Sequence, residues 1–277
     1  MNLVEDFLQA KRDNLTSDLT IKNYRIDLNQ FLPLMFNKKV EEVTIEDLKG
    51  VTILKTRDTL LKLQADKGYT VTTINRRMAS FKSLMSHYSA RVGFPNTLHD
   101  MKSLNDTRLK EIEFIANDDV KKIIDKAKRT STEMYLIMGL LFNTGLRSAE
   151  LLSLKVENVH EDCIIVEGKG GTMRRVELNT VAKDSLKTYL DKEGKTSGNV
   201  LDMQYVTLRR RYTRFLKSCN IECSKLHTTR KSFASNLVAK GAKLTDVSSL
   251  LGHSTTSTLE RFYLGSNTKQ LTVSLLE

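Results

Sequence analysis

Five short segments in the second half of the sequence carry side chains that bind anions, transfer protons or form covalent bonds. Arginine and lysine bind anionic groups, histidine exchanges protons near neutral pH, and tyrosine can act as a nucleophile. In chain order the candidates are Arg147 within Gly145–Leu151, Lys169, the pair His227 and Arg230, His253 within Leu251–Ser254, and Tyr263 after Phe262. Together these residue types could carry out chemistry on an anionic group.

Taken one at a time, each candidate has an ordinary structural explanation. An arginine after a turn is usually a surface cation, and Lys169 at a hairpin tip would be solvated. His253 could cap a helix, and Tyr263 could be a core aromatic whose hydroxyl is hydrogen-bonded. His227 and Arg230 are three residues apart, which places them on one face of a helix. The order of the set along the chain is therefore more informative than any member.

That order, Arg, Lys, His-x-x-Arg, His and a tyrosine near the C-terminus, resembles the tyrosine recombinase (phage integrase) family. The likeness covers nearly the whole chain, since Thr73–Arg77 resembles the family's N-terminal core-binding domain and residues 113–277 resemble its catalytic domain. The resemblance implies a mainly α fold with a small β-hairpin, built as a two-domain DNA clamp: a helical core-binding domain and a mixed α+β catalytic domain. It also implies a site-specific recombinase that cleaves and rejoins DNA strands through a covalent 3′-phosphotyrosine.

The resemblance implies that Tyr263 is the nucleophile, that Arg147 and Arg230 hold the non-bridging oxygens of the scissile phosphate, and that Lys169 is the general acid. These roles agree with the chemistry, because the transition state spreads negative charge over the phosphate oxygens. A phenol with a pKa of about 10 must lose its proton on attack, which nearby cations favour. The leaving 5′-oxygen needs a proton donor. Because the covalent intermediate keeps the bond energy, no cofactor and no metal are expected.

The resemblance assigns three further positions. His227 would assist acid/base work on the tyrosyl side, and His253 would donate a hydrogen bond to the phosphate. Glu150, three residues after Arg147, matches an acidic position that braces the active-site framework. One position departs from the family pattern, because Lys231 follows Arg230 where many members have a second histidine.

A zinc site is the alternative for part of this region. Cys219, Cys223 and His227 are spaced four residues apart and would share one face of a continuous helix, with Cys163 as a fourth ligand. A predicted helix break at residues 221–225 opposes this arrangement, and buried thiols are the other explanation. We therefore expect no metal.

The elements that must position these residues follow from periodicity. Period-two alternation around Gly168 and Gly171 predicts a β-hairpin between Cys163 and Leu178. Before it we expect a helix capped by Asn117, a more apolar helix from Glu133 to Phe142, a turn at 143–145 and a short helix containing Leu151. Successive helices should fill the chain from Val181, broken at Gly194, Gly198, Gly241 and Gly252.

The first hundred residues read as helices, the clearest carrying an apolar stripe at Ile74, Met78, Phe81, Met85 and Tyr88. Thr44 and Asp47 predict a capping box, and Gly68 and Gly93 predict helix ends. On the polar faces of the striped helix we expect Arg76, Arg77 and Lys82, as candidate contacts with the DNA backbone. The predicted domains are residues 1–103, a linker at 104–112, and the catalytic domain with its tail at 113–277.

Positive charge is concentrated late in the chain. Lys and Arg number 44 against 33 Asp and Glu, a formal net charge of +11. Residues 201–250 hold ten Lys or Arg and three acidic residues, which gives +7 for that stretch. Within it, Arg209, Arg210 and Arg211 are predicted to contact phosphates, although a basic surface helix is the alternative.

Composition narrows the class of protein. A 40% hydrophobic and 28% charged chain excludes a disordered or collagen-like protein. Three cysteines oppose a disulfide framework and favour a reducing compartment. No segment resembles a signal peptide or a membrane span. We expect a cytoplasmic protein with no membrane partner.

The expected partner is double-stranded DNA with specific recombination sites, bound by a homotetramer on paired sites. The apolar tail Leu264–Glu277 is expected to dock on a neighbouring subunit, with packing on its own domain as the alternative. Integration or excision of a mobile element and resolution of DNA multimers both remain open as biological roles. Because helices begin near residue 3, we expect a simpler recombinase without an added arm-binding domain. A type IB-like topoisomerase and a non-catalytic DNA-binding accessory factor are the alternative functions.

Overall fold

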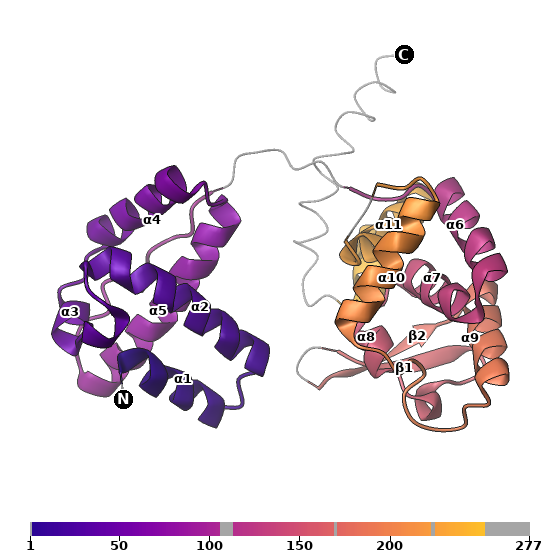
Figure 1. Ribbon diagram of the computed structural model, residues 1–277, viewed down its shortest axis with the longest axis horizontal. Coiled ribbons are helices and arrows are strands. Elements are labelled where there is room, and N and C mark those ends of the chain that lie inside the picture. Colours follow the sequence, from indigo (N-terminus) through magenta and orange to yellow (C-terminus); the bar gives the residue numbers. More distant parts are fainter. Residues whose placement is uncertain (1, 106–112, 169–170, 223–224, 253–277) are drawn as a thin grey trace, which may run out of the picture. The chain divides into compact units, whose positions relative to one another are not determined.

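The computed structural model describes residues 2–105, 113–168, 171–222 and 225–252 (Figure 1). The chain forms two compact units, residues 1–108 and 109–277. The predicted linker falls largely, and the predicted tail wholly, outside the described residues. Among the described helices, none is long and apolar enough to cross a membrane.

Unit 1 is entirely helical in its described part. Its elements are α1 (Leu3–Asp13), α2 (Asp18–Phe36), a 3₁₀ turn at Val40–Glu42, α3 (Ile45–Lys49), α4 (Ile53–Lys67) and α5 (Val71–Val92). Helix α5 contacts α1, α2 and α4 and buries all five residues of the predicted apolar stripe. The ring centroids of Phe31 in α2 and Phe81 in α5 lie 4.9 Å apart, and both rings are fully buried in this core. Burial of one long apolar face therefore organises the unit.

The local signals for helix ends in unit 1 were read correctly. Thr44 accepts a hydrogen bond from the Asp47 amide, and Asp47 accepts one from the Thr44 amide, which forms the predicted capping box before α3. Helices α4 and α5 end at Gly68 and Gly93, both in the left-handed conformation. These contacts satisfy backbone groups that a helix terminus would leave unpaired.

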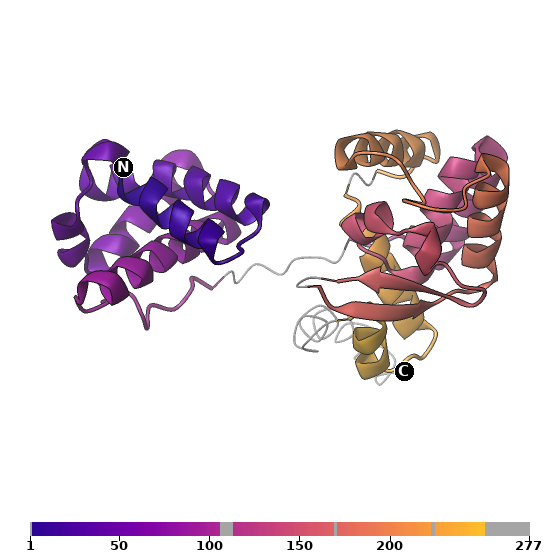
Figure 2. The ribbon, with the colours of Figure 1, turned by 90° about the horizontal axis from the view of Figure 1, so that it is seen from below.

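Unit 2 packs helices around one central apolar helix and carries the hairpin. It contains α6 (Asn117–Thr130), α7 (Thr132–Thr144), α8 (Ser148–Ser153), a 3₁₀ turn at Val156–Asn158, β1 (Cys163–Glu167), β2 (Met173–Glu177), α9 (Thr180–Glu193), α10 (Tyr205–Ser218), α11 (His227–Ala239) and α12 (Leu244–Leu251). Helix α7 is buried along most of its length and contacts α6, α8, α9 and α11. The antiparallel strands β1 and β2 run side by side (Figure 2). The predicted fold class, mainly α with a small β-hairpin, is confirmed.

Two predicted boundaries were wrong by a residue or two. Asn117 is the first residue of α6, and Ala116 occupies the N-cap without a side-chain hydrogen bond. Asp118 and Asp119 lie in the first turn, where negative charge interacts favourably with the helix dipole. These two carboxylates stabilise the start of α6 in place of a capping side chain. Helix α7 continues through Asn143 and Thr144 and ends at Gly145, rather than ending before a turn.

We predict that Gly139→Ala destabilises the protein, although alanine in a helix interior is normally better than glycine by about 1 kcal/mol. A Cβ at Gly139 would lie 2.6 Å from Ser185 Oγ and 2.8 Å from Ser185 Cβ, where α7 meets α9. Overpacking of this kind costs about 1–3 kcal/mol. Urea unfolding followed by circular dichroism should show a lower midpoint for this variant.

Gly50→Ala is the control, because the nearest atom to its added Cβ is a carbonyl oxygen 3.6 Å away. A midpoint for Gly139→Ala equal to or above that of the wild type would contradict the close α7–α9 contact.

Candidate functional site

The site is built where α7 ends and α8 begins. Gly145 adopts a φ of +64°, and an added Cβ would lie 2.6 Å from Phe233 and 2.7 Å from Leu251. Glycine is therefore required for both conformation and space. The sharp turn after α7 places Arg147 at the N-cap of α8, with its side chain 37% exposed. The Gly145 carbonyl is left free to accept a hydrogen bond from outside the helix.

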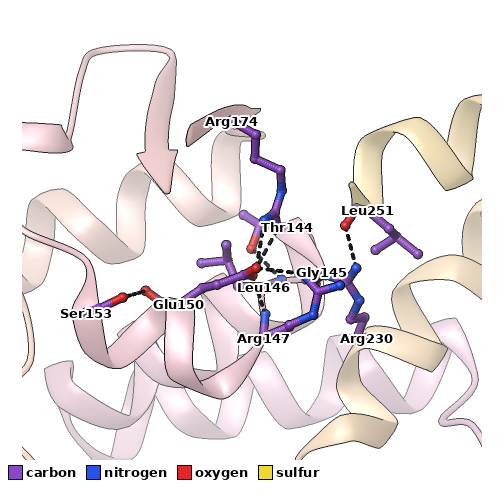
Figure 3. Close-up of polar contacts among 9 residues, drawn as sticks. All are labelled: Thr144, Gly145, Leu146, Arg147, Glu150, Ser153, Arg174, Arg230 and Leu251. Atoms are coloured by element: carbon purple, nitrogen blue, oxygen red, sulfur yellow. Dashed lines mark hydrogen bonds and ion pairs between the residues drawn. The ribbon is translucent and has the colours of Figure 1, made fainter. Parts of the chain in front are cut away.

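Glu150 is the acidic centre of the site and is almost fully buried, at 4% exposure. Its Oε1 accepts from Arg147 Nη1 and from Arg174 Nη1, both at 2.7 Å. Its Oε2 accepts from the Arg147 amide at 2.7 Å and from Arg174 Nη2 at 2.9 Å. Figure 3 shows the two guanidinium groups converging on this carboxylate. The predicted bracing position is thus occupied by a carboxylate that accepts four hydrogen bonds.

The electrostatic consequence is a strongly acidic carboxyl group. Burial alone would raise the pKa of Glu150, but hydrogen bonds from Arg174 and from the Arg147 amide and side chain outweigh it and hold the pKa at about 2. Glu150 is therefore ionised at neutral pH and forms ion pairs with both arginines.

Arg230 lies beside this pair, and within the described ranges it forms no ion pair with a carboxylate. It is 3% exposed, donates from Nη1 to the Gly145 carbonyl at 2.8 Å, and donates from Nη2 to the Leu251 carbonyl. Burial, followed by the charge of Arg147, lowers the pKa of Arg230 to about 10, which still leaves it charged at neutral pH. Figure 3 shows its guanidinium next to that of Arg147. Two neutral carbonyl oxygens orient this cation without cancelling its charge.

His227 stands in the first turn of α11, three residues before Arg230. It is exposed at the surface, yet partial desolvation, followed by the charges of Arg230, Lys231 and Arg147, lowers the pKa of its imidazole. The lowered pKa favours the neutral form of the ring. The structure thus brings together Arg147, His227 and Arg230 of the predicted catalytic set. Lys169, His253 and Tyr263 lie outside the described residues.

Arg174 belongs to the site but was missed by the sequence analysis. In the hairpin register Val166 pairs with Arg174 and Ile164 with Val176, so Arg174 shares the buried face of β2 with Val176. The hairpin pattern could have indicated this residue, because it places an arginine at an inward-facing position of the strand. A charge at such a position needs a buried partner.

The cations predicted to contact DNA from unit 1 make contacts within the unit. Arg77 was expected on a polar face, and this was wrong: it is 3% exposed, hydrogen-bonds Gln30 and stacks 3.8 Å from the centre of the Tyr69 ring. It is three residues after Ile74, which places it beside the buried stripe. Arg76 donates to the buried carboxylate of Asp27 at 2.6 Å, while Lys82 donates to the carbonyls of residues 99 and 101, each at 3.0 Å.

The basic run on α10 is exposed. Arg209, Arg210 and Arg211 are all exposed and lie outside the buried face that carries Leu208 and Tyr212. Arg211 is paired with Glu133, whereas Arg209 and Arg210 have no ion pair within the described part of the chain.

The helical premise of the zinc alternative is wrong. Helix α10 ends at Ser218 and α11 begins at His227, so Cys219 and His227 do not share one continuous helix. Among the described residues, no group of three His, Cys, Asp or Glu side chains could hold a metal ion. Cys163 and Cys219 are free thiols, and Cys223 lies outside the described residues.

Comparison with known proteins identifies the family. Residues 113–270 match the phage integrase family. The chain is 30% identical to tyrosine recombinase XerD of Oceanobacillus iheyensis, over 93% of this chain and 91% of that protein. The chain belongs to the phage integrase family. It is a tyrosine-type site-specific recombinase, and neither the topoisomerase nor the accessory-factor alternative is favoured.

Other relatives and solved structures agree. Tyrosine recombinase XerA of Saccharolobus solfataricus is 29% identical over 84% of this chain and 78% of its own length. A XerH recombinase bound to a palindromic difH substrate in a post-cleavage complex superposes with a TM-score of 0.73 at 18% identity, covering 93% of this chain and 80% of that one. A lambda integrase dimer bound to a COC′ core site gives a TM-score of 0.69 at 15% identity, covering 92% and 95%. The recombinase shares their fold.

We predict that the Glu150 carboxylate gives the recombinase an acid-sensitive stability. The folded pKa of about 2 lies below the ordinary value of 4.5, so the stabilisation is complete above pH 4.5 and is lost as the pH falls toward 2. The loss amounts to at most about 3–4 kcal/mol, since the two pKa values differ by about 2.5 and each tenfold change in proton affinity corresponds to about 1.4 kcal/mol. Urea unfolding across this pH range should show a shallower pH dependence for Glu150→Gln than for the wild type.

Glu177→Gln provides the comparison, because Glu177 pairs with Arg175 on the surface at 61% exposure. The stability of Glu177→Gln should depend on pH in the same way as that of the wild type. Identical curves for Glu150→Gln and the wild type would refute the strong coupling of Glu150 to its arginines.

Proposed function

We propose that the recombinase binds the scissile phosphate of duplex DNA at Arg147 and Arg230 and cleaves the strand by attack of Tyr263, which forms a 3′-phosphotyrosine. The observation that carries this proposal is the charge of the site. Arg147, Arg174 and Arg230 lie around one carboxylate, that of Glu150, so these four side chains together carry an excess of two positive charges. A buried excess of positive charge favours an anion.

The free donors of the two arginines suit a phosphodiester. Arg230 uses two of its five N–H groups on backbone carbonyls, and the Arg147 side chain uses one on Glu150, among the described contacts. The remaining donors can bind the non-bridging oxygens, where negative charge grows as the phenolate attacks. The fixed guanidinium groups need no reorganisation during the reaction.

Proton transfers complete the proposed mechanism. Lys169 would protonate the leaving 5′-oxygen, His227 would exchange the proton of the tyrosyl hydroxyl, and His253 would donate to the phosphate. Attack reverses when a 5′-hydroxyl from another strand displaces the tyrosine, so the phosphodiester is conserved throughout. This sequence of steps needs no cofactor from the protein.

The proposed DNA contacts outside the reacting phosphate are electrostatic. Arg209 and Arg210 on α10 would bind backbone phosphates, with Arg211 contributing if it exchanges Glu133 for a phosphate. Arg76 and Lys82 remain candidates in unit 1, whereas the burial of Arg77 removes it.

The proposed assembly is a homotetramer on two paired sites, with the tail Leu264–Glu277 docked on a neighbouring subunit. Integration or excision of a mobile element and resolution of DNA multimers are both consistent with this chemistry. A cytoplasmic location is part of the proposal, and the odd number of cysteines, three, supports it.

The proposal predicts that Tyr263→Phe abolishes covalent attachment to DNA while leaving affinity unchanged, because only the nucleophilic oxygen is lost. The DNA site is first mapped as the segment near the protein's own gene that the protein protects from cleavage. A nicked suicide duplex carrying that site then traps the covalent adduct of the wild type, which is detected on a denaturing gel. Tyr205→Phe, at an exposed tyrosine in α10, should cleave like the wild type. Absence of a wild-type adduct, or an adduct with Tyr263→Phe, would reject the assignment.

A second prediction concerns salt. Arg210→Gln should reduce the slope of log affinity against log salt by about 1, which is the effect of one lost phosphate contact. Arg211→Gln should change it less, because the Glu133 ion pair already engages Arg211. Fluorescence anisotropy with the same duplex over a range of salt concentrations measures both slopes, and equal slopes for Arg210→Gln and the wild type would exclude Arg210 as a contact.

A further inference from the structure

Arg174 is the one member of the arginine cluster to which the family resemblance gives no role. It extends from β2 with 15% of its side chain exposed, and both oxygens of Glu150 accept hydrogen bonds from it. Those same two oxygens accept from the side chain and the amide of Arg147. Arg174 and Arg147 are therefore joined through a single carboxylate (Figure 3).

Arg174 also contacts the turn that holds Arg230. A Cβ added at Gly252 would lie 3.0 Å from Arg174 Cδ and 3.3 Å from its Nε, so the end of α12 packs directly on this side chain. The preceding residue, Leu251, gives its carbonyl to Arg230. One side chain of the hairpin thus contacts the carboxylate that holds Arg147 and the turn that holds Arg230.

Folding alone does not account for an arginine here. Its Nε is buried and has no hydrogen-bond acceptor in the described part of the chain, which is a cost to stability. Its neighbours on the same face of the hairpin are apolar, and an apolar side chain at such a position is often at least as stabilising as a buried ion pair.

We infer that Arg174 is a positioning residue for strand cleavage, which holds Glu150 so that the Arg147 guanidinium stays fixed and keeps its charge available to the scissile phosphate. Without Arg174, Glu150 would lose two of its four hydrogen bonds and could turn. Its negative charge would then fall on Arg147 alone, and the excess positive charge of the cluster would drop from two to one. This inference rests on the proposed role of Arg147.

The test is single-turnover cleavage of the nicked suicide duplex at saturating protein, with rate constant and amplitude recorded separately. Arg174→Met should lower the rate constant about 10- to 100-fold, since a displacement of about 1 Å at a catalytic group can cost 100-fold. The amplitude and the DNA affinity should stay unchanged. Arg174→Lys, which keeps the charge but loses the paired hydrogen bonds, should be intermediate.

Arg175→Met is the matched control, because Arg175 is the next residue on the same strand, faces outward and forms an ion pair with Glu177 at the surface. It should cleave like the wild type. In a Glu150→Gln background, Arg174→Met should cause little further loss, because both substitutions interrupt the same connection to Arg147.

The outcomes separate the two claims. If the wild type cleaves the duplex and Arg174→Met cleaves it with the same rate constant, the inference is overturned and the proposed function stands. A lower amplitude with a normal rate constant also overturns it, because that result means fewer folded molecules. Failure of the wild type to form any adduct rejects the proposed function itself.

Discussion

The carboxylate of Glu150 is shared by two guanidinium groups, while a third, that of Arg230, is buried beside them with backbone carbonyls as its partners. Each element near the site serves this arrangement. Gly145 must be the C-cap of α7 so that its carbonyl faces Arg230, and Arg147 must be the N-cap of α8 so that Glu150 reaches back to the Arg147 amide. Strand β2 and helix α11 then supply Arg174 and Arg230.

The choice of acceptors decides what the site can do. A carboxylate opposite Arg230 would hold it equally well but would neutralise it, whereas carbonyl oxygens fix its geometry and leave the charge for a ligand. Burial, followed by the charge of Arg147, lowers the pKa of Arg230 to about 10. Such a cluster opposes folding, and the apolar packing around α7 must offset it. The rigid core thereby keeps the cations close together before any anion arrives.

Much of the scaffold could be predicted from the spacing of apolar residues. The apolar stripe in α5 and the apolar–polar alternation in the hairpin both follow from which side chains are buried. The proximity of Arg147, His227 and Arg230 followed from a family resemblance rather than from spacing, since 80 residues separate Arg147 from His227. Arg77 was misplaced because a cation beside an apolar stripe is normally expected at the surface. Its burial is explained by partners on other segments, namely the Tyr69 ring, the Gln30 side chain and the buried carboxylate of Asp27. Arg174 was missed because its partner Glu150 lies on a different element, and pairing across elements leaves no local pattern.

The most direct test of the central claim is a crystal structure of Tyr263→Phe bound to its duplex site, with the scissile phosphate uncleaved. The charge arrangement predicts that the non-bridging oxygens accept hydrogen bonds from both Arg147 and Arg230, at about 2.7–2.9 Å. Arg230 should keep its bonds to the carbonyls of Gly145 and Leu251, and Glu150 should stay with Arg147 and Arg174. A scissile phosphate that makes no contact with Arg230, or an Arg230 that pairs with a carboxylate in the complex, would contradict the account.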